Sequence, residues 1–242
     1  MVLWFSRTRK RSEVPTLRSR SESEPTTKVD LASLTPDLRT FLGKAAYLQL
    51  VDFENMSLAI TSAPTAEAKA ALSTAATLTL EQHHALAAEL VRAGYDAGQV
   101  MAEFSDEIDA LTNRLIANTW PEMLVTCHIT AGFLDDFLAR LAAGLQRDVA
   151  ARVIQSLQSD VGASIVAEHI SNTIEADPTL GSRLAMWGRR LVGDTMLIAR
   201  YTLSEEKLDP AQHDSVEARI EPVFTELIAA HTRRMDALGL TA

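Results

Sequence analysis

The segment Glu81-Gln82-His83-His84 carries the strongest chemical signal in the sequence. Glu81 and His84 are three residues apart, so on a helix their side chains share a face and can bind one metal ion together. A carboxylate with an imidazole suits iron or manganese. A Glu-x-x-His pair also occurs on ordinary solvated helix surfaces, so a metal site needs ligands from other elements.

Glu54 supplies a candidate third ligand. It precedes Glu81 by 27 residues, and the helix break at Pro64 lies between them, so a hairpin would bring both residues to similar heights. Its neighbours Phe53 and Met56 are apolar, and a charge among apolar residues is costly unless it is paired or ligated. Glu54, Glu81 and His84 together would form half of a di-metal carboxylate site.

The second half of such a site should come from a later pair of helices, in which Asp135, Asp136 and Asp160 are the candidate acids. If the second hairpin copies the first, the offsets of 27 and 30 residues from Asp135 or Asp136 lead to four residues that cannot bind a metal: Gly162, Ile165, Ala163 and Val166. Asp160 has a suitable depth, but Ala163 follows it where a histidine is needed. We therefore expect a site in which Asp160, with Asp135 or Asp136, at most loosely holds a second metal.

Apolar residues at three-to-four spacing predict an all-α protein without competing strands. Cap-and-proline signals mark several helix starts: Thr35-Pro36, the capping box Thr119-Trp120-Pro121-Glu122, Asp177-Pro178 and Asp209-Pro210. The predicted helices cover about 36–62, 65–92, 96–118, 119–144, 147–176, 179–205 and 211–238.

The lengths of the predicted connections indicate the topology. The first two helices form one hairpin, the fourth and fifth form another, and the more polar third helix bridges them. Two hairpins joined by one long crossover are the ferritin-like four-helix bundle, with the last two helices packed outside it. A helical repeat array is the alternative, but no 34- to 47-residue self-similarity supports it.

Charge divides the chain into two parts. The net charge is −9, yet residues 1–30 carry seven Lys and Arg against four Asp and Glu. We expect residues 1–33 to be a disordered basic arm and residues 34–242 to be a single domain. The acidic body disfavours phosphate-backbone binding, so a nucleic acid or an anionic lipid would bind only through the arm.

The sequence offers no signal for a membrane span or an export segment. It contains no run of about 18 apolar residues. The apolar start Met1–Phe5 precedes the basic cluster, which is the reverse of a secretory signal, so we expect a cytoplasmic protein. The lone Cys127 excludes an intramolecular disulfide, and His128 beside it is either a hydrogen-bonded core residue or a substitute ligand.

Several motifs resemble a bacterial group of ferritin-like-fold proteins, which is itself similar to the tRNA isopentenyladenosine hydroxylase branch of di-iron proteins. The resemblance covers about residues 36–205, and its most specific motif is Trp187-Gly188-Arg189-Arg190-Leu191-Val192-Gly193. The supporting motifs are Asn118–Val125, Leu134-Asp135-Asp136-Phe137 and Ile174–Pro178. The resemblance implies that Glu54, Glu81 and His84 are first-hairpin ligands, whereas the family's second acid-x-x-His maps onto Asp160 to Ala163, where this chain departs from it.

These observations leave two main functions open. The first is a non-catalytic or weakly metal-binding scaffold that acts through a protein partner or a homo-oligomer. The second is a di-iron oxygenase or hydroxylase acting on a modified tRNA nucleotide, with iron bound by Glu54, Glu81 and His84. Iron storage is a third and weaker alternative.

Overall fold

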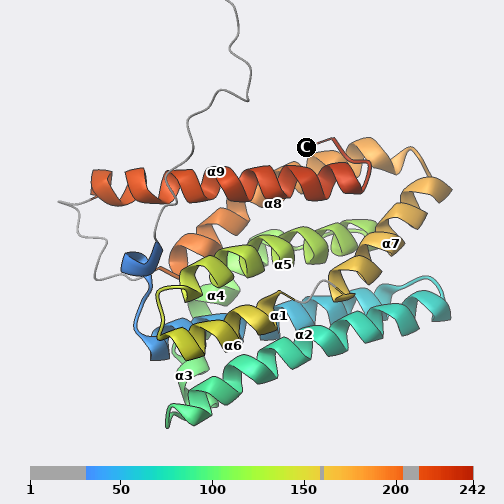
Figure 1. Cartoon of the computed structure of the whole chain (residues 1–242). Coiled ribbons are helices and arrows are strands. Elements are labelled where there is room, and N and C mark those ends of the chain that lie inside the picture. The colour runs from blue at the N-terminus through green and yellow to red at the C-terminus, as the bar shows by residue number, and fades with distance from the viewer. Residues whose placement is uncertain (1–30, 159–160, 204–212, 242) are drawn as a thin grey trace, which may run out of the picture.

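The computed structural model describes residues 31–158, 161–203 and 213–241, and within these residues the chain forms helices and no strands. Five helices make a bundle: α1 (Leu38–Ser62), α2 (Ala66–Arg92), α5 (Trp120–Ala142), α6 (Arg147–Leu157) and α7 (Val161–Ala176). α1 and α2 form the first hairpin, and α5 with α6 and α7 forms the second (Figure 1). The predicted ferritin-like all-α bundle is confirmed.

The last two helices cover the outer side of the second hairpin. α8 (Leu180–Tyr201) and α9 (His213–Ala237) both pack on α5, which therefore runs between them and the α1–α2 hairpin (Figure 1). Burial on several sides explains why α5 is so apolar, with Phe133, Phe137 and Leu138 in the core. None of the described helices is both long and apolar enough to cross a membrane.

The start of the fold differs from the prediction. Asp37, not Thr35, caps α1, because its carboxylate accepts the backbone N–H of Thr40 at 3.1 Å. The Thr35 hydroxyl instead donates to the Leu141 carbonyl at 2.7 Å. A 3₁₀ helix (Leu31–Leu34) precedes Thr35, and its side chains Leu31 and Leu34 are buried, so residues 31–33 belong to the folded body. Residues 1–30 of the predicted arm lie outside the described residues.

Two helices that the spacing predicts as continuous are divided. The crossover consists of α3 (Ala97–Ala102), α4 (Ser105–Thr112) and a 3₁₀ turn (Asn113–Leu115). It breaks where Val100 and Phe104 pack so closely on α1 that a Cβ on Gly43 would lie 2.7 and 2.8 Å from them. The predicted helix 147–176 is divided into α6 and α7, and the sequence between them contains a serine and an aspartate, Ser159-Asp160, which are types that favour helix ends over helix interiors.

The start of α5 agrees with the sequence. The Glu122 carboxylate accepts the backbone N–H group of Thr119 at 3.2 Å, which is the glutamate half of the predicted capping box, and also that of Asn118 at 3.1 Å. The Trp120 indole N–H donates to the Ala59 carbonyl at 2.9 Å and joins this start to α1.

The Trp-Gly-Arg-Arg motif of α8 has a structural explanation. The Trp187 indole N–H donates to the Thr126 hydroxyl of α5 at 2.9 Å. A Cβ on Gly188 would lie 2.5 Å from the Met235 sulfur, so glycine lets α9 approach α8. The guanidinium of Arg190 lies over the Trp187 ring at 5.2 Å from its centroid. This motif therefore joins α5, α8 and α9.

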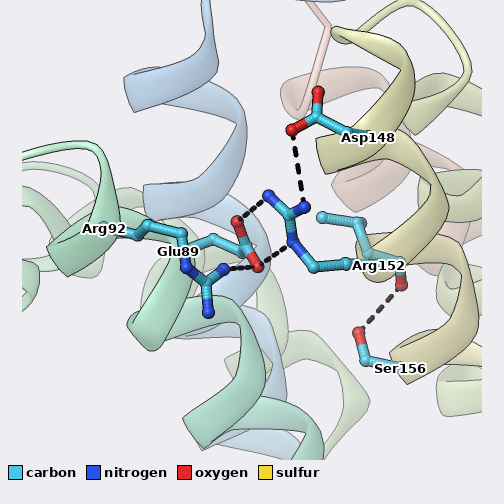
Figure 2. A network of polar contacts seen from close by, with 6 residues as sticks. Glu89, Arg92, Asp148, Arg152 and Ser156 are labelled. Carbon is cyan, nitrogen blue, oxygen red and sulfur yellow. Dashed lines mark hydrogen bonds and ion pairs between the residues drawn. The ribbon is translucent and has the colours of Figure 1, made fainter.

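An ion-pair network connects α2 to α6 (Figure 2). The Glu89 side chain is only 8% exposed, and Arg152 donates to its two oxygens through Nε at 2.7 Å and Nη2 at 2.9 Å. Arg92 donates to the same carboxylate, and Asp148 accepts from Arg152 at 3.4 Å. The hydrogen bonds from Arg152 are the main reason why the pKa of Glu89 is lowered.

Candidate functional site

A cavity of about 390 Å³ lies inside the bundle. Its lining comes from both hairpins, from the end of α6 and from α9. The polar lining residues are Asp52 of α1; Thr79 and Gln82 of α2; Cys127, His128, Asp135 and Asp136 of α5; Gln158 after α6; and Arg234 of α9. Most of these side chains are half-buried, so solvent reaches the cavity.

The predicted first-hairpin ligands do not line this cavity. Glu54, Glu81 and His84 are all exposed. Of the predicted second-hairpin ligands, Asp135 lines the cavity, and Asp160 lies outside the described residues. In the segment Glu81–His84, the buried histidine is His83, whose Nδ1 lies 2.9 Å from the Ala46 carbonyl. The structure thus does not gather the four of these residues that it describes, Glu54, Glu81, His84 and Asp135, into one site, and the role of all five as ligands stays a prediction.

The register of the first hairpin is displaced by two residues from the predicted one. Thr79 and Gln82 follow Asp52 by 27 and 30 residues, which are the offsets that separate Glu54 from Glu81 and His84. The hairpin geometry was therefore inferred correctly, but two residues turn an α-helix by about 200°, to the opposite face. The buried spacing of Leu48, Met56 and Ala59, into which Asp52 fits, is the sequence signal that identifies the inward face.

The second hairpin follows the predicted offsets. Gly162, Ala163 and Val166 line the cavity opposite Asp135 and Asp136. None of these three residues has a side chain that binds metals. At these offsets the cavity is lined by Thr79 and Gln82 on α2 and, counted from Asp136, by Ala163 and Val166 on α7, in place of carboxylates and histidines.

Burial dominates the electrostatics of the two facing aspartates. It raises the pKa of Asp52 well above its usual value, and the charge of Asp135 raises that pKa further. Burial likewise raises the pKa of Asp135 to about 7, although the Gln49 amide, which donates to it at 2.6 Å, acts in the opposite direction. Within the described part of the chain, neither a hydrogen bond nor a cation acts on the Asp52 carboxyl.

His128 is a neutral group in this cavity. Burial, and after it the positive charge of Arg234, lowers the pKa of His128 to about 4, while a hydrogen bond with the Ala163 backbone acts the other way. Its Nδ1 is buried and has no hydrogen-bond partner among the described residues. His128 thus lies half-buried on the cavity wall, and both interpretations of it, a hydrogen-bonded core residue and a substitute ligand, stay predictions.

The contribution of α9 to the site was not expected. Arg234 donates to Asp136 at 2.7 Å, and it reaches the cavity because α5 has a glycine beside it. A Cβ on Gly132 would lie 2.5 Å from Arg234 Nε. Of the three aspartates that line the cavity, Asp136 therefore has a cationic partner. The spacing of residues in the sequence gave no signal for this contact, because the two residues are 98 positions apart.

The donor set does not fit a metal pair. Among the residues that the structure describes, no three His, Cys, Asp or Glu side chains are grouped so that they could hold one ion. Cys127 also lines the cavity, but burial raises the pKa of its thiol, which disfavours the thiolate that binds metals. Asp52 and Asp135 remain as two carboxylates from opposite hairpins.

Comparison with known families agrees with this architecture. Residues 36–209, more than two thirds of the chain, match the family described as ferritin-like domain, actinomycetes. The chain belongs to this ferritin-like family. A comparison with curated proteins finds no match. The relation to the tRNA hydroxylase branch stays a prediction.

Proposed function

We propose that this protein is a ferritin-like scaffold that binds a small molecule in its central cavity and does no di-metal oxygen chemistry. The observation that carries the proposal is the identity of the inward residues on α2 and α7. Thr79 and Gln82 on α2, and Ala163 and Val166 on α7, stand where a di-metal bundle needs carboxylates and histidines.

The cavity has the properties of a small-molecule site. Its volume of about 390 Å³ lies near the lower end of the range of ligand pockets, roughly 300–1,000 Å³. Apolar residues such as Met56, Ala131 and Val166 alternate with a few polar groups. A bundle core that needed only to be stable would be filled, because interiors are packed as densely as organic crystals.

A di-iron hydroxylase acting on a modified tRNA nucleotide is the alternative that the family resemblance implies. It requires a stoichiometric metal pair, and the residues available for this are Asp52 and Asp135 inside the bundle or Glu54, Glu81 and His84 on its surface. Anaerobic titration of the full chain with Fe²⁺, followed by calorimetry and optical spectroscopy, separates the two functions.

We expect no saturable binding of one or two equivalents of Fe²⁺. Stoichiometric binding that is lost in Asp52→Asn and Asp135→Asn would overturn the proposal and place a metal in the cavity. Stoichiometric binding that is lost in Glu81→Ala would overturn it in favour of the surface set Glu54, Glu81 and His84.

A further inference from the structure

We propose that the central cavity binds a small organic cation, with its ammonium or guanidinium group between Asp52 and Asp135. This inference rests on the proposed function and names the class of ligand. Four features of the cavity support it: the charge of its lining, the partners of its carboxyl groups, its hydrogen-bond acceptors and its apolar walls.

The charge of the lining favours a cation. Three aspartates and one arginine line the cavity, and the arginine is paired with Asp136. Asp52 and Asp135 therefore remain as two acidic groups from opposite hairpins without a cationic partner of their own. A cation between them would lower both raised pKa values and bind the ionised carboxylates, whereas an anionic ligand would oppose their ionisation and a neutral ligand would form no ion pair with them.

The two carboxyl groups also have free capacity for hydrogen bonds. Asp135 accepts one hydrogen bond from Gln49 at 2.6 Å, through Oδ1. Asp52 lines the cavity, and no hydrogen bond from a described residue acts on it. An ammonium group has three N–H donors and no acceptor, and charge-assisted hydrogen bonds to carboxylates are among the strongest that proteins form.

Neighbouring residues on α2 supply further acceptors. Thr79 lines the cavity, and its hydroxyl donates to the Ala75 carbonyl at 3.3 Å, which leaves its oxygen lone pairs to accept. The amide of Gln82, one turn further along the helix, provides a carbonyl oxygen. An ammonium ion uses such neutral oxygens readily, whereas a transition-metal ion would need histidine or carboxylate in these positions.

The rest of the lining suits a short carbon chain. Met56, Leu78, Ala131 and Val166 offer apolar surface beside the acids. Since the cavity is small, an alkylammonium or alkylguanidinium with a chain of a few carbons fits better than a large aromatic cation.

An isosteric series of probes tests the class of ligand. n-Butylammonium, n-butanol and n-butyrate have the same chain and differ in charge. Saturation-transfer NMR and calorimetry on the full chain at pH 7.5 should show saturable binding of n-butylammonium, and weaker or undetectable binding of the other two. Binding of n-butanol or n-butyrate that equals or exceeds that of n-butylammonium would overturn the inference.

Variants of the two aspartates test the location. Asp52→Asn and Asp135→Asn keep the shape of the side chain and remove the carboxyl group that ionises against a bound cation, and each should weaken n-butylammonium binding by roughly tenfold to a hundredfold. Glu175→Gln, which removes an exposed carboxylate from α7, is the matched control and should bind like the wild type. Circular dichroism and thermal unfolding of each variant establish that it folds.

The outcomes distinguish this inference from the proposed function. Equal binding of n-butylammonium by the wild type and both aspartate variants would place it outside the cavity and overturn the inference. If neither Fe²⁺ nor n-butylammonium binds the wild type, the inference fails while the case against a metal pair stands. If Fe²⁺ binds stoichiometrically and depends on Asp52 and Asp135, both proposals fail.

Discussion

The ion pair between Glu89 and Arg152 should contribute measurably to stability, because it holds α6 against α2 (Figure 2). Hydrogen bonds to charged groups contribute about 1.5–3 kcal/mol each. The Arg152 side chain is 40% exposed, so solvent screening reduces this, and we expect a coupling energy of about 1–2 kcal/mol for the pair. A double-mutant cycle with Glu89→Ala, Arg152→Ala and the double variant, followed by urea unfolding, measures it.

The pair Arg140–Glu226 between α5 and α9 is the matched control. Its side chains are 40% and 47% exposed, so its coupling energy should be about 0.2–1 kcal/mol. The sign of the pH dependence also follows. The folded pKa of Glu89 is lowered, so its contribution is present above the unfolded pKa and is lost as the pH falls through the folded value. A Glu89–Arg152 coupling no larger than the control, or one that persists at pH 2, would refute this reasoning.

Three further predictions concern the site and its surroundings. Gly132→Ala should destabilise the fold by about 1–3 kcal/mol in urea unfolding, because its Cβ would lie 2.5 Å from Arg234 Nε. The control Gly193→Ala, whose Cβ would have no atom within 4 Å, should be neutral or stabilising. Equal effects of the two substitutions would contradict this prediction. Cys127 should resist iodoacetamide in the native protein and react after unfolding, because its thiol is buried and its pKa raised; rapid native labelling would count against the buried position. The imidazole of His128 should stay neutral down to about pH 5 in an NMR titration. Since its folded pKa is lowered to about 4, the stability linked to it is present above the unfolded pKa and is lost as the pH falls toward 4, and a midpoint near 6.5 would disprove the assignment.

Local sequence signals predicted the elements well where a single residue type sets the backbone. The capping box at Thr119–Glu122 lies where α5 begins, and Pro64 lies between the end of α1 and the start of α2. Prediction failed where packing decided. The crossover bends so that Phe104 can lie against α1, and Thr35 turns to Leu141 on α5, neither of which leaves a trace in the local sequence.

The candidate site shows the same division at the level of side chains. The offsets of 27 and 30 residues describe the hairpin correctly, but two registers satisfy them, and the spacing alone does not choose between Glu54 and Asp52. The Glu-x-x-His signature favoured the wrong face for this cavity, since Glu54, Glu81 and His84 are exposed. The buried stripe of α1 would have favoured Asp52, which fits it as well as Leu48 and Met56 do.

The sequence by itself determined the all-α class, the two hairpins and the absence of metal-binding side chains at Gly162, Ala163 and Val166, because helix period, caps and residue chemistry are local properties. Only the tertiary structure decided which face of α1 and α2 points inward, and that Arg234 of α9 reaches across Gly132 to pair with Asp136. Both depend on how helices distant in the sequence rotate to bury their apolar faces, and that rotation follows from packing between helices and not from the spacing within one.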